Sequence, residues 1–346
     1  MRIGMSLEYA HGFKEAVTEL AHYERAGLDI IFVAEAYTFD AVSQLGYIAA
    51  KTELVEIASG ILPIYSRTPA LMAMTAAGLD YVSDGRFTLG IGASGPQVIE
   101  GFHGVPYTAP LGRTREIIDI CRKVWRRERL THTGKHYTLP LPAGHGTGLG
   151  KPLKLINQPL RERIPIVVAA IGPKNVELAS EVAEGWLPIF YMPERAADVW
   201  GAALAAGKAA RDPSLGDLDI LVQVPLAIGD DVEHLRELSR PTIALYIGGM
   251  GAKGKNFYNN LACRYGFEKE AAQIQDLYLE GKKKEAAALV PDERLDGMSL
   301  IGSEAFVRDR LAVIRESGVT TVKVTPLAPD LAGRLRLIDT VKNLTT

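Results

Sequence analysis

The chain has 346 residues, of which 47% are hydrophobic, so it can bury the core of one large α/β domain or of two smaller ones. Its 39 basic and 41 acidic residues almost balance, which argues against nucleic acid or an acidic membrane surface as a partner. The two cysteines lack C-x-x-C spacing, the sequence begins without a signal-like segment, and no apolar run approaches the ~20 residues of a membrane span. We therefore expect a cytoplasmic protein with free thiols.

The predicted elements alternate between strand and helix along the whole chain. Strands are expected over residues 2–7, 29–34, 55–61, 86–90, 165–170, 186–190, 219–227 and 320–325. Helices are expected over residues 12–25, 40–50, 68–82, 112–127, 174–183, 193–211, 303–317 and 329–342. Four helix-to-strand junctions contain a glycine, which suits the left-handed backbone at a helix exit: Gly27, Gly85, Gly185 and Gly318. Eight such units predict an α/β protein with one (β/α)8 TIM-barrel domain spanning residues 1–346.

Two stretches depart from this alternation and are interpreted as insertions, at about 129–164 and 231–298. The first is dense in glycine and proline and is compatible with a hairpin; long segments of this kind often act as lids or binding loops. The second is predicted to be mostly helical, and its apolar residues should pack against the barrel or another subunit. We expect Tyr246 to Gly254 to line the pocket, with helix packing alone as the alternative.

A glycine loop follows the fourth predicted strand, where residues 90–95 spell G-x-G-x-x-G. A Rossmann dinucleotide site would need a long helix after the loop and an acidic residue roughly 20 positions on. Here Pro96 and Gly101 interrupt the following segment, residues 96–111 are expected to form a loop, and the next helix begins with Arg113. A purely structural turn is a second interpretation. We favour a third, a phosphate or cofactor cradle at the carboxyl-terminal mouth of a barrel.

Several stretches together resemble the bacterial luciferase-like superfamily, in particular its branch of oxidoreductases that use the deazaflavin coenzyme F420. They are Phe-Val-Ala-Glu at 32–35, Ala-Ser-Gly-Ile-Leu-Pro-Ile-Tyr-Ser-Arg-Thr-Pro-Ala at 58–70, Ser-Asp-Gly-Arg-Phe at 83–87, Ala-Ala-Ile-Gly-Pro-Lys at 169–174 and Ala-Glu-Gly-Trp at 183–186. The resemblance covers nearly the whole chain. It implies an eight-stranded barrel with insertions, in agreement with the strand count.

The resemblance also implies where a cofactor would bind. It places a non-proline cis peptide under the deazaflavin ring, here at Gly60-Ile61, and the phosphate-bearing tail at the helix start Gly172-Pro173-Lys174, where free amides and the helix dipole suit an anion. The candidate cofactor-binding residues are Ser59, Gly60, Ile61, Gly92, Ala93, Ser94, Gly95, Ile171, Gly172, Pro173 and Lys174.

Candidates for acid–base chemistry are fewer. Glu35 ends the second predicted strand, where relatives carry an acidic residue, but Ala36 and Tyr37 follow it here in place of the histidine of sugar-phosphate and alcohol oxidising relatives. His103 lies near the glycine loop and is a second candidate, although a lone loop histidine is more often a surface residue. The histidines of the first insertion have no carboxylate at metal-ligand spacing, so we predict no metal site: His132, His136 and His145.

These observations favour an F420-dependent oxidoreductase that transfers a hydride between the coenzyme and an unidentified organic substrate. The same motifs are compatible with FMN, so an FMN-dependent luciferase-like monooxygenase is an alternative. A barrel that binds F420 without catalysis is a second alternative, supported by the missing histidine after Glu35. We expect a homodimer or a higher homo-oligomer and no nucleic acid or membrane partner. The loops at the barrel mouth set specificity, so the substrate is not predicted.

Overall fold

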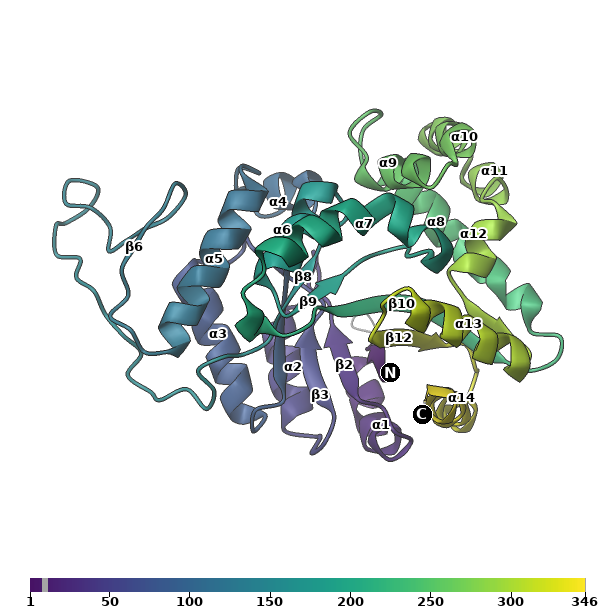
Figure 1. Ribbon diagram of the computed structural model, residues 1–346, viewed down its shortest axis with the longest axis horizontal. Helices are drawn as coiled ribbons and strands as arrows, with labels where there is room; N and C mark the ends of the chain where they lie inside the picture. The colour runs from purple at the N-terminus through teal and green to yellow at the C-terminus, as the bar shows by residue number, and fades with distance from the viewer. Residues whose placement is uncertain (8–11, 346) are drawn as a thin grey trace.

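The computed structural model describes residues 1–7 and 12–345, and within them a parallel β-barrel surrounded by helices forms the core (Figure 1). The barrel strands, in chain order, are β1 (Arg2–Ser6), β2 (Ile30–Val33), β3 (Glu56–Ser59), β5 (Phe87–Gly92), β8 (Ile166–Ala169), β9 (Gly185–Leu187), β10 (Asp219–Ile228) and β12 (Thr321–Pro326). Neighbouring strands pair in parallel, and the ring closes where β12 pairs with both β1 and β10. The predicted TIM barrel is therefore confirmed.

Helices cover the outside of this barrel because each has one apolar face that must be buried. They are α1 (Phe13–Arg25), α2 (Ala41–Ala49), α3 (Pro69–Val82), α5 (Pro110–Trp125), α6 (Pro173–Val182), α7 (Pro193–Ala210), α13 (Glu304–Glu316) and α14 (Leu331–Thr345). A large apolar cluster lies between helices and strands. A second, small cluster fills the barrel interior with Ile30, Phe32, Ala58, Val167 and Leu221. Among the helices of the described residues, none combines the length and apolar character required to cross a bilayer.

Three of the predicted boundaries that are wrong lie near the candidate site. The strand expected at 55–61 breaks after Ser59, and a two-residue strand, β4 (Leu62–Pro63), pairs with β5 beyond the break. The strand expected to end at Gly90 continues to Gly92, because Gly90 to Gly92 pair with β8. The expected loop at 96–111 contains a short helix, α4 (Pro96–Gly101), and its end already belongs to α5.

The glycines at the helix exits do not all have the expected role. Gly27, Gly85 and Gly318 have φ angles of 90°, 81° and 92°, the left-handed backbone that glycine adopts without strain. Gly185 instead begins β9, and a Cβ atom there would lie 3.0 Å from both Leu221 Cδ1 and Val167 Cγ2. Gly185 is therefore explained by close packing inside the barrel and not by its backbone conformation.

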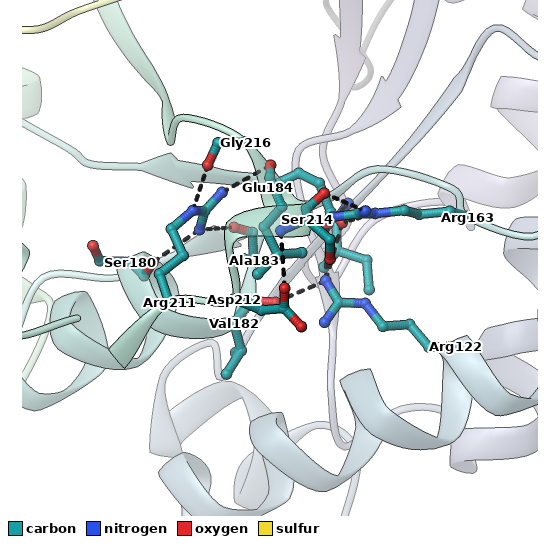
Figure 2. A network of polar contacts seen from close by, with 12 residues as sticks. Arg122, Arg163, Ser180, Val182, Ala183, Glu184, Arg211, Asp212, Ser214 and Gly216 are labelled. Carbon is teal, nitrogen blue, oxygen red and sulfur yellow. Dashed lines mark hydrogen bonds and ion pairs between the residues drawn. The ribbon is translucent and has the colours of Figure 1, made fainter. Parts of the chain in front are cut away.

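An ionic network holds the junction between α6 and β9 (Figure 2). Arg122 and Arg163 donate to Glu184 Oε1 over 3.0 and 2.9 Å, and Arg211 donates to the carbonyl of Ala183 over 2.6 Å. Glu184 also accepts a hydrogen bond from the backbone of Ile166 at the start of β8. The stretch at 183–186 thus ties strands together at the amino-terminal end of the barrel, which is a structural role.

The first insertion contains a hairpin of β6 (His132–Thr133) and β7 (Thr138–Leu139), in the segment that projects away from α3 and α5 in Figure 1. Glu116 of α5 anchors its turn by accepting backbone hydrogen bonds from residues 135–137. His132 contacts Glu116 and Asp119 through its two ring nitrogens, at 3.1 and 3.2 Å. Sequence spacing did not show these neighbours, because α5 brings both acids to His132 from 13 and 16 positions away.

The Glu116 anchor gives a pH prediction. Burial raises the pKa of Glu116, but hydrogen bonds from His132 and from the amides of Tyr137, His136 and Lys135 lower it further than burial raises it. A lowered folded-state pKa stabilises the hairpin above the unfolded pKa of about 4.3 and loses that contribution as the pH falls through the folded value. Hydrogen-exchange protection of amides 135–137 should therefore persist at neutral pH and fall below about pH 4.

Replacing Glu116 by alanine should remove this protection at neutral pH. A suitable control is Glu128→Ala, because Glu128, which follows α5, forms an exposed ion pair with Arg126. Unchanged protection in Glu116→Ala would contradict the assigned anchor.

The second insertion is mostly helical, as predicted. Its elements are η2 (Glu233–Ser239), α8 (Arg240–Ala244), η3 (Leu245–Gly249), α9 (Phe257–Arg264), α10 (Glu268–Leu279), α11 (Lys283–Ala288) and α12 (Asp292–Gly297). They gather together beside the barrel (Figure 1), and a short strand, β11 (Leu300–Gly302), returns the chain to the barrel beside β10.

Candidate active site at the carboxyl-terminal mouth

Inward-facing polar residues of β1, β10 and β12 open a polar mouth in the barrel, with Ser6 and Thr325 near the carboxyl-terminal ends of their strands and Gln223 midway along β10. A Cβ atom on Gly4 would lie 3.3 Å from Phe32 in the interior cluster, so Gly4 faces inward. Side chains alternate along a strand, so Ser6 also faces inward. Gln223 and Thr325 share this face through the register of β10 and β12. Ser6, Gln223 and Thr325 are nevertheless exposed, which shows that solvent reaches the barrel interior here.

The predicted cis peptide at Gly60-Ile61 is confirmed. It lies at the same end of the barrel, directly above Phe32, because a Cβ atom on Gly60 would lie 3.2 Å from Phe32 Cβ. The Ser59 hydroxyl donates to the Gly90 carbonyl and accepts from the Gly90 amide, both over 2.8 Å. Ser59 therefore holds the Gly60-Ile61 segment between β3 and β4, called the bulge below, against β5. Both hydrogen bonds of the Ser59 hydroxyl are made with the backbone of Gly90.

Close packing explains the first two glycines of the G-x-G-x-x-G pattern. A Cβ atom on Gly90 would lie 1.9 Å from the Ser59 carbonyl oxygen, and one on Gly92 would lie 3.2 Å from Ile61 Cδ1. Both positions keep the bulge in contact with β5. The favoured interpretation of Gly90 as part of a phosphate cradle is therefore wrong, since its backbone groups bond to Ser59.

The remaining loop residues stay candidates for cofactor contact. Gly92 ends β5 at the mouth, Ala93 and Ser94 follow, and Gly95 precedes α4. Ser94 has a φ of 58°, and its carbonyl accepts a hydrogen bond from the Tyr107 hydroxyl over 3.3 Å. Tyr107 thus holds the loop through its backbone, and a role for Gly92 to Gly95 toward a cofactor stays a prediction.

The predicted tail site is an uncapped helix start. Gly172 is the N-cap of α6, Pro173 occupies its first turn, and no side chain caps this end. Lys174 is exposed and pairs with Glu177 at 2.9 Å. The carbonyl of Ile171 accepts hydrogen bonds from Trp200 and Arg264, so the backbone before the helix is held in place. The first amides of α6 are the kind of donors that bind phosphate.

Glu35 is not a free acid. Arg67 donates to both of its carboxylate oxygens, over 2.6 and 2.9 Å, and the backbone of Ala41 at the start of α2 donates to it over 3.1 Å. The side chains of Glu35 and Arg67 are only 8% and 11% exposed. Burial lowers the pKa of Arg67, but Glu35 and then Asp40 raise it more. Glu35 is therefore bound in a charge pair that shapes the mouth, an arrangement which sequence spacing alone did not reveal.

His103 follows α4 and packs edge-on against Phe102, with ring centroids 5.4 Å apart. Its Nε2 atom is buried and, within residues 1–7 and 12–345, has no hydrogen-bond partner. Phe102 also lies 6.3 Å from the ring of Tyr37, so the two segments that carry His103 and Glu35 are neighbours. A proton-transfer role for His103 stays a prediction.

Aromatic residues connect the second insertion to the mouth. The Tyr246 ring lies 5.2 Å from that of Phe190, which follows β9, and 4.7 Å from that of Tyr258. Burial raises the pKa of Tyr258 to about 12, and the neighbouring Tyr246 and Tyr107 contribute to this shift. Tyr258 of the insertion is therefore close to Tyr107, the residue that holds the glycine loop. This arrangement supports a pocket wall at Tyr246, whereas Gly248 and Gly249, in the same stretch, pack against Tyr278.

Asn256 has a structural role. It is 1% exposed, donates to the carbonyls of Tyr246 and Ile247, and accepts from the first amides of α9. Replacing it would loosen the insertion whatever the pocket contains, so Tyr246 is the residue whose replacement tests the wall.

The sequence interpretation missed Lys323, a buried lysine on the inward face of β12. Its signal is visible in retrospect, because Lys323 stands between two valines, Val322 and Val324, in the middle of a mostly buried strand. It also missed Arg67, whose partner Glu35 lies 32 positions away. Within the described residues, no group of three or more histidine, cysteine or acidic side chains is arranged to hold a metal ion.

A separate hollow of about 440 Å³ lies at the opposite end of the barrel. It is lined by residues such as Arg2, Glu56, Arg161 and Asp219 at the amino-terminal ends of the strands. Residues at this end of TIM barrels serve stability, whereas the active sites lie at the carboxyl-terminal face. The polar mouth above Phe32 is therefore the candidate active site.

Comparison with known proteins agrees with this fold. Residues 1–321 match the model of the luciferase-like monooxygenase family. A Mycobacterium tuberculosis protein, provisionally described as a coenzyme F420-dependent oxidoreductase, is 41% identical over 333 residues, covering 94% of this chain and 95% of that protein. A 5,10-methylenetetrahydromethanopterin reductase of Archaeoglobus fulgidus is 26% identical over 332 residues, covering 92% of this chain and 93% of that protein.

The fold is likewise similar to that of solved structures. The coenzyme F420-dependent tetrahydromethanopterin reductase of Methanopyrus kandleri superposes with a TM-score of 0.79, at 20% sequence identity. The alignment covers 98% of this chain and 96% of that chain.

Proposed function

The chain belongs to the luciferase-like monooxygenase family, and on that premise we propose that it is an oxidoreductase that binds coenzyme F420 and moves a hydride between it and an organic substrate. The observation that carries the proposal is the 41% identity, over nearly the full length of both chains, to a protein described as F420-dependent. Relatives named as a reductase and a dehydrogenase support an enzyme over a protein that only binds the coenzyme.

The residues of the mouth fit this coenzyme. Phe32 and the Gly60-Ile61 bulge offer an apolar floor for a flat ring, while Ser6, Gln223 and Thr325 offer polar groups at its edge. The uncapped start of α6 at Gly172 supplies amides for a phosphate in the tail. When bound, F420 supplies the two-electron hydride chemistry.

The protein supplies orientation and a dry environment. The Glu35–Arg67 pair fixes the chain between β2 and α2 beside the bulge, and Ser59 fixes the bulge itself. Tyr246 and Tyr258 would form a wall on the insertion side that limits access of water to the reacting atoms.

A fluorescence titration tests the proposal. F420 at a fixed concentration should lose or shift its fluorescence as micromolar protein is added, and a saturating curve is expected. The Tyr246→Ala variant should bind more weakly than the wild type, since it removes part of the wall. Absence of any change with F420, together with a yellow preparation that releases FMN on denaturation, would replace the proposal with the FMN-dependent alternative.

A further inference from the structure

Lys323 is a buried lysine inside the barrel. In the strand register it pairs with Gly4 of β1 and with Gln223 of β10. Gly4 faces the interior cluster, so Lys323 shares that inward face. Two residues further on, Thr325 is exposed at the mouth. Lys323 therefore begins below the mouth and its long side chain extends within the barrel interior.

In the part of the chain that the structure describes, the ammonium group of Lys323 has no counter-charge. The residue is 5% exposed, and its Nζ atom lies 4.9 Å from the centroid of the Phe32 ring, the residue beneath the cis peptide. Among residues 1–7 and 12–345, the Phe32 ring faces Nζ, and no carboxylate or hydrogen-bond acceptor pairs with Nζ. A largely buried cation without a counter-charge is costly, and such a group is a candidate for a functional role.

The charged groups on the neighbouring strands are occupied elsewhere. Arg2 of β1 pairs with Glu56 of β3 at 2.6 Å and with Asp219 of β10 at 3.5 Å, at the amino-terminal end of the barrel. On the level of Lys323 and above it, the inward side chains Ser6 of β1 and Gln223 of β10 are neutral, as is Phe32 of β2. Burial alone lowers the pKa of Lys323 to about 8.

Such a group is suited to proton transfer. A pKa close to the working pH allows the amine to give up and regain a proton in each cycle. Cationic Nζ would stabilise negative charge that develops on an oxygen in a site of low polarity. Within the described residues, Glu35 and Arg67 at the mouth pair with each other, and the neutral polar side chains of Ser6 and Thr325 suit an uncharged substrate.

Resting on the proposed function, we propose that Lys323 is a catalytic residue whose ammonium donates a proton to the oxygen of an uncharged ketone or enone substrate. As a hydride bonds to the carbonyl carbon of a ketone, or to the β-carbon of an enone, the π electrons move to the oxygen. The N–H bond of Lys323 breaks and an O–H bond forms. The neutral amine then regains a proton from water at the open mouth. In the oxidative direction the neutral amine removes the hydroxyl proton.

Competitive acetylation measures this role without turnover. Wild-type enzyme is treated with trace acetic anhydride between pH 6 and pH 10, and the Lys323 peptide is quantified against that of exposed Lys208 in α7. Half-maximal reactivity of Lys323 is expected near pH 8. Adding F420 with cyclohexanone should reduce Lys323 acetylation and move its midpoint upward, because a bound oxygen favours the charged amine.

Two variants complete the test. Lys323→Met should keep or raise the melting temperature, since it removes an unpaired buried charge, and should bind F420 within about threefold of wild type. It should slow the oxidation of reduced F420 by 2-cyclohexenone at least about 100-fold and abolish the basic limb of the pH profile. Lys323→Arg should keep the fold and the positive charge, but the basic limb of the pH–rate profile should move to higher pH.

The outcomes separate this inference from the proposed function. If wild-type enzyme fails to bind F420, the proposed function fails and this role fails with it. If F420 binds but acetylation of Lys323 is unaffected by F420 and cyclohexanone, or Lys323→Met reacts like the wild type, the role of Lys323 alone is overturned.

Discussion

Replacing Gly90 by alanine is expected to destabilise the protein by at least about 3 kcal/mol, near the upper end of the usual cost of overpacking. The added Cβ atom would lie 1.9 Å from the Ser59 carbonyl oxygen, so β3 and β5 would have to separate. Ser59 bonds to both backbone groups of Gly90, and that separation would displace the Gly60-Ile61 bulge. F420 binding should weaken at least about tenfold, equivalent to about 1.4 kcal/mol.

Two other glycines provide graded controls for Gly90→Ala. At Gly92 the added Cβ meets the end of the Ile61 side chain at 3.2 Å, which can move, so a smaller loss is expected. Gly78 lies in α3, and a Cβ atom added there would meet no atom of the described residues outside the helix backbone within 4 Å. Alanine at this position should therefore raise the free energy of unfolding by up to about 1 kcal/mol through helix propensity. Urea unfolding measures the series. Equal stabilities for Gly90→Ala and Gly78→Ala would contradict the assigned packing of the bulge.

Removing the positive charge of Arg67 is expected to cost about 3–5 kcal/mol, the usual cost of leaving one member of a buried ion pair alone. The Arg67→Met variant would leave Glu35, with a side chain 8% exposed, facing only the amide of Ala41. Glu35→Gln should cost less, since Arg67 still contacts Asp40 at 3.0 Å. Asp40→Asn is the control, because Asp40 is half exposed and asparagine also caps a helix.

The same variants distinguish two roles for Glu35. A structural ion pair predicts that Glu35→Gln lowers the free energy of unfolding and changes F420 turnover in proportion to the loss of folded protein. A general acid or base predicts little change in stability and a loss of turnover of about 100-fold or more. Unfolding curves and rates on the same preparations decide between them, and the second pattern would contradict the ion-pair assignment.

The barrel was predictable because its signals are local. Each strand is a short apolar run beside a helix of period 3.6, and repetition of this unit eight times leaves few other folds. Boundaries near the site were less predictable. Gly90 looked like the beginning of a loop, but packing against Ser59 makes it part of a strand.

The functional side chains were harder to predict because their partners are distant in sequence. Glu35 ends a strand in a position typical of a catalytic acid, yet Arg67 pairs with it from 32 positions away. No carboxylate stands at metal-ligand spacing from His132 in the sequence, yet α5 places Glu116 and Asp119 beside it. Lys323 was overlooked because alternation alone does not say whether a lone lysine faces the barrel axis or the solvent; the register with Gly4 does.

The most direct test of the account is a crystal structure of the protein with F420 bound. The account predicts the deazaflavin ring at the carboxyl-terminal mouth, over Phe32 and the Gly60-Ile61 bulge, with its phosphate at the amides that follow Gly172. It also predicts that Nζ of Lys323 faces the site where a substrate oxygen would bind. A ring bound in the hollow at the opposite end of the barrel, or a phosphate held away from the start of α6, would contradict it.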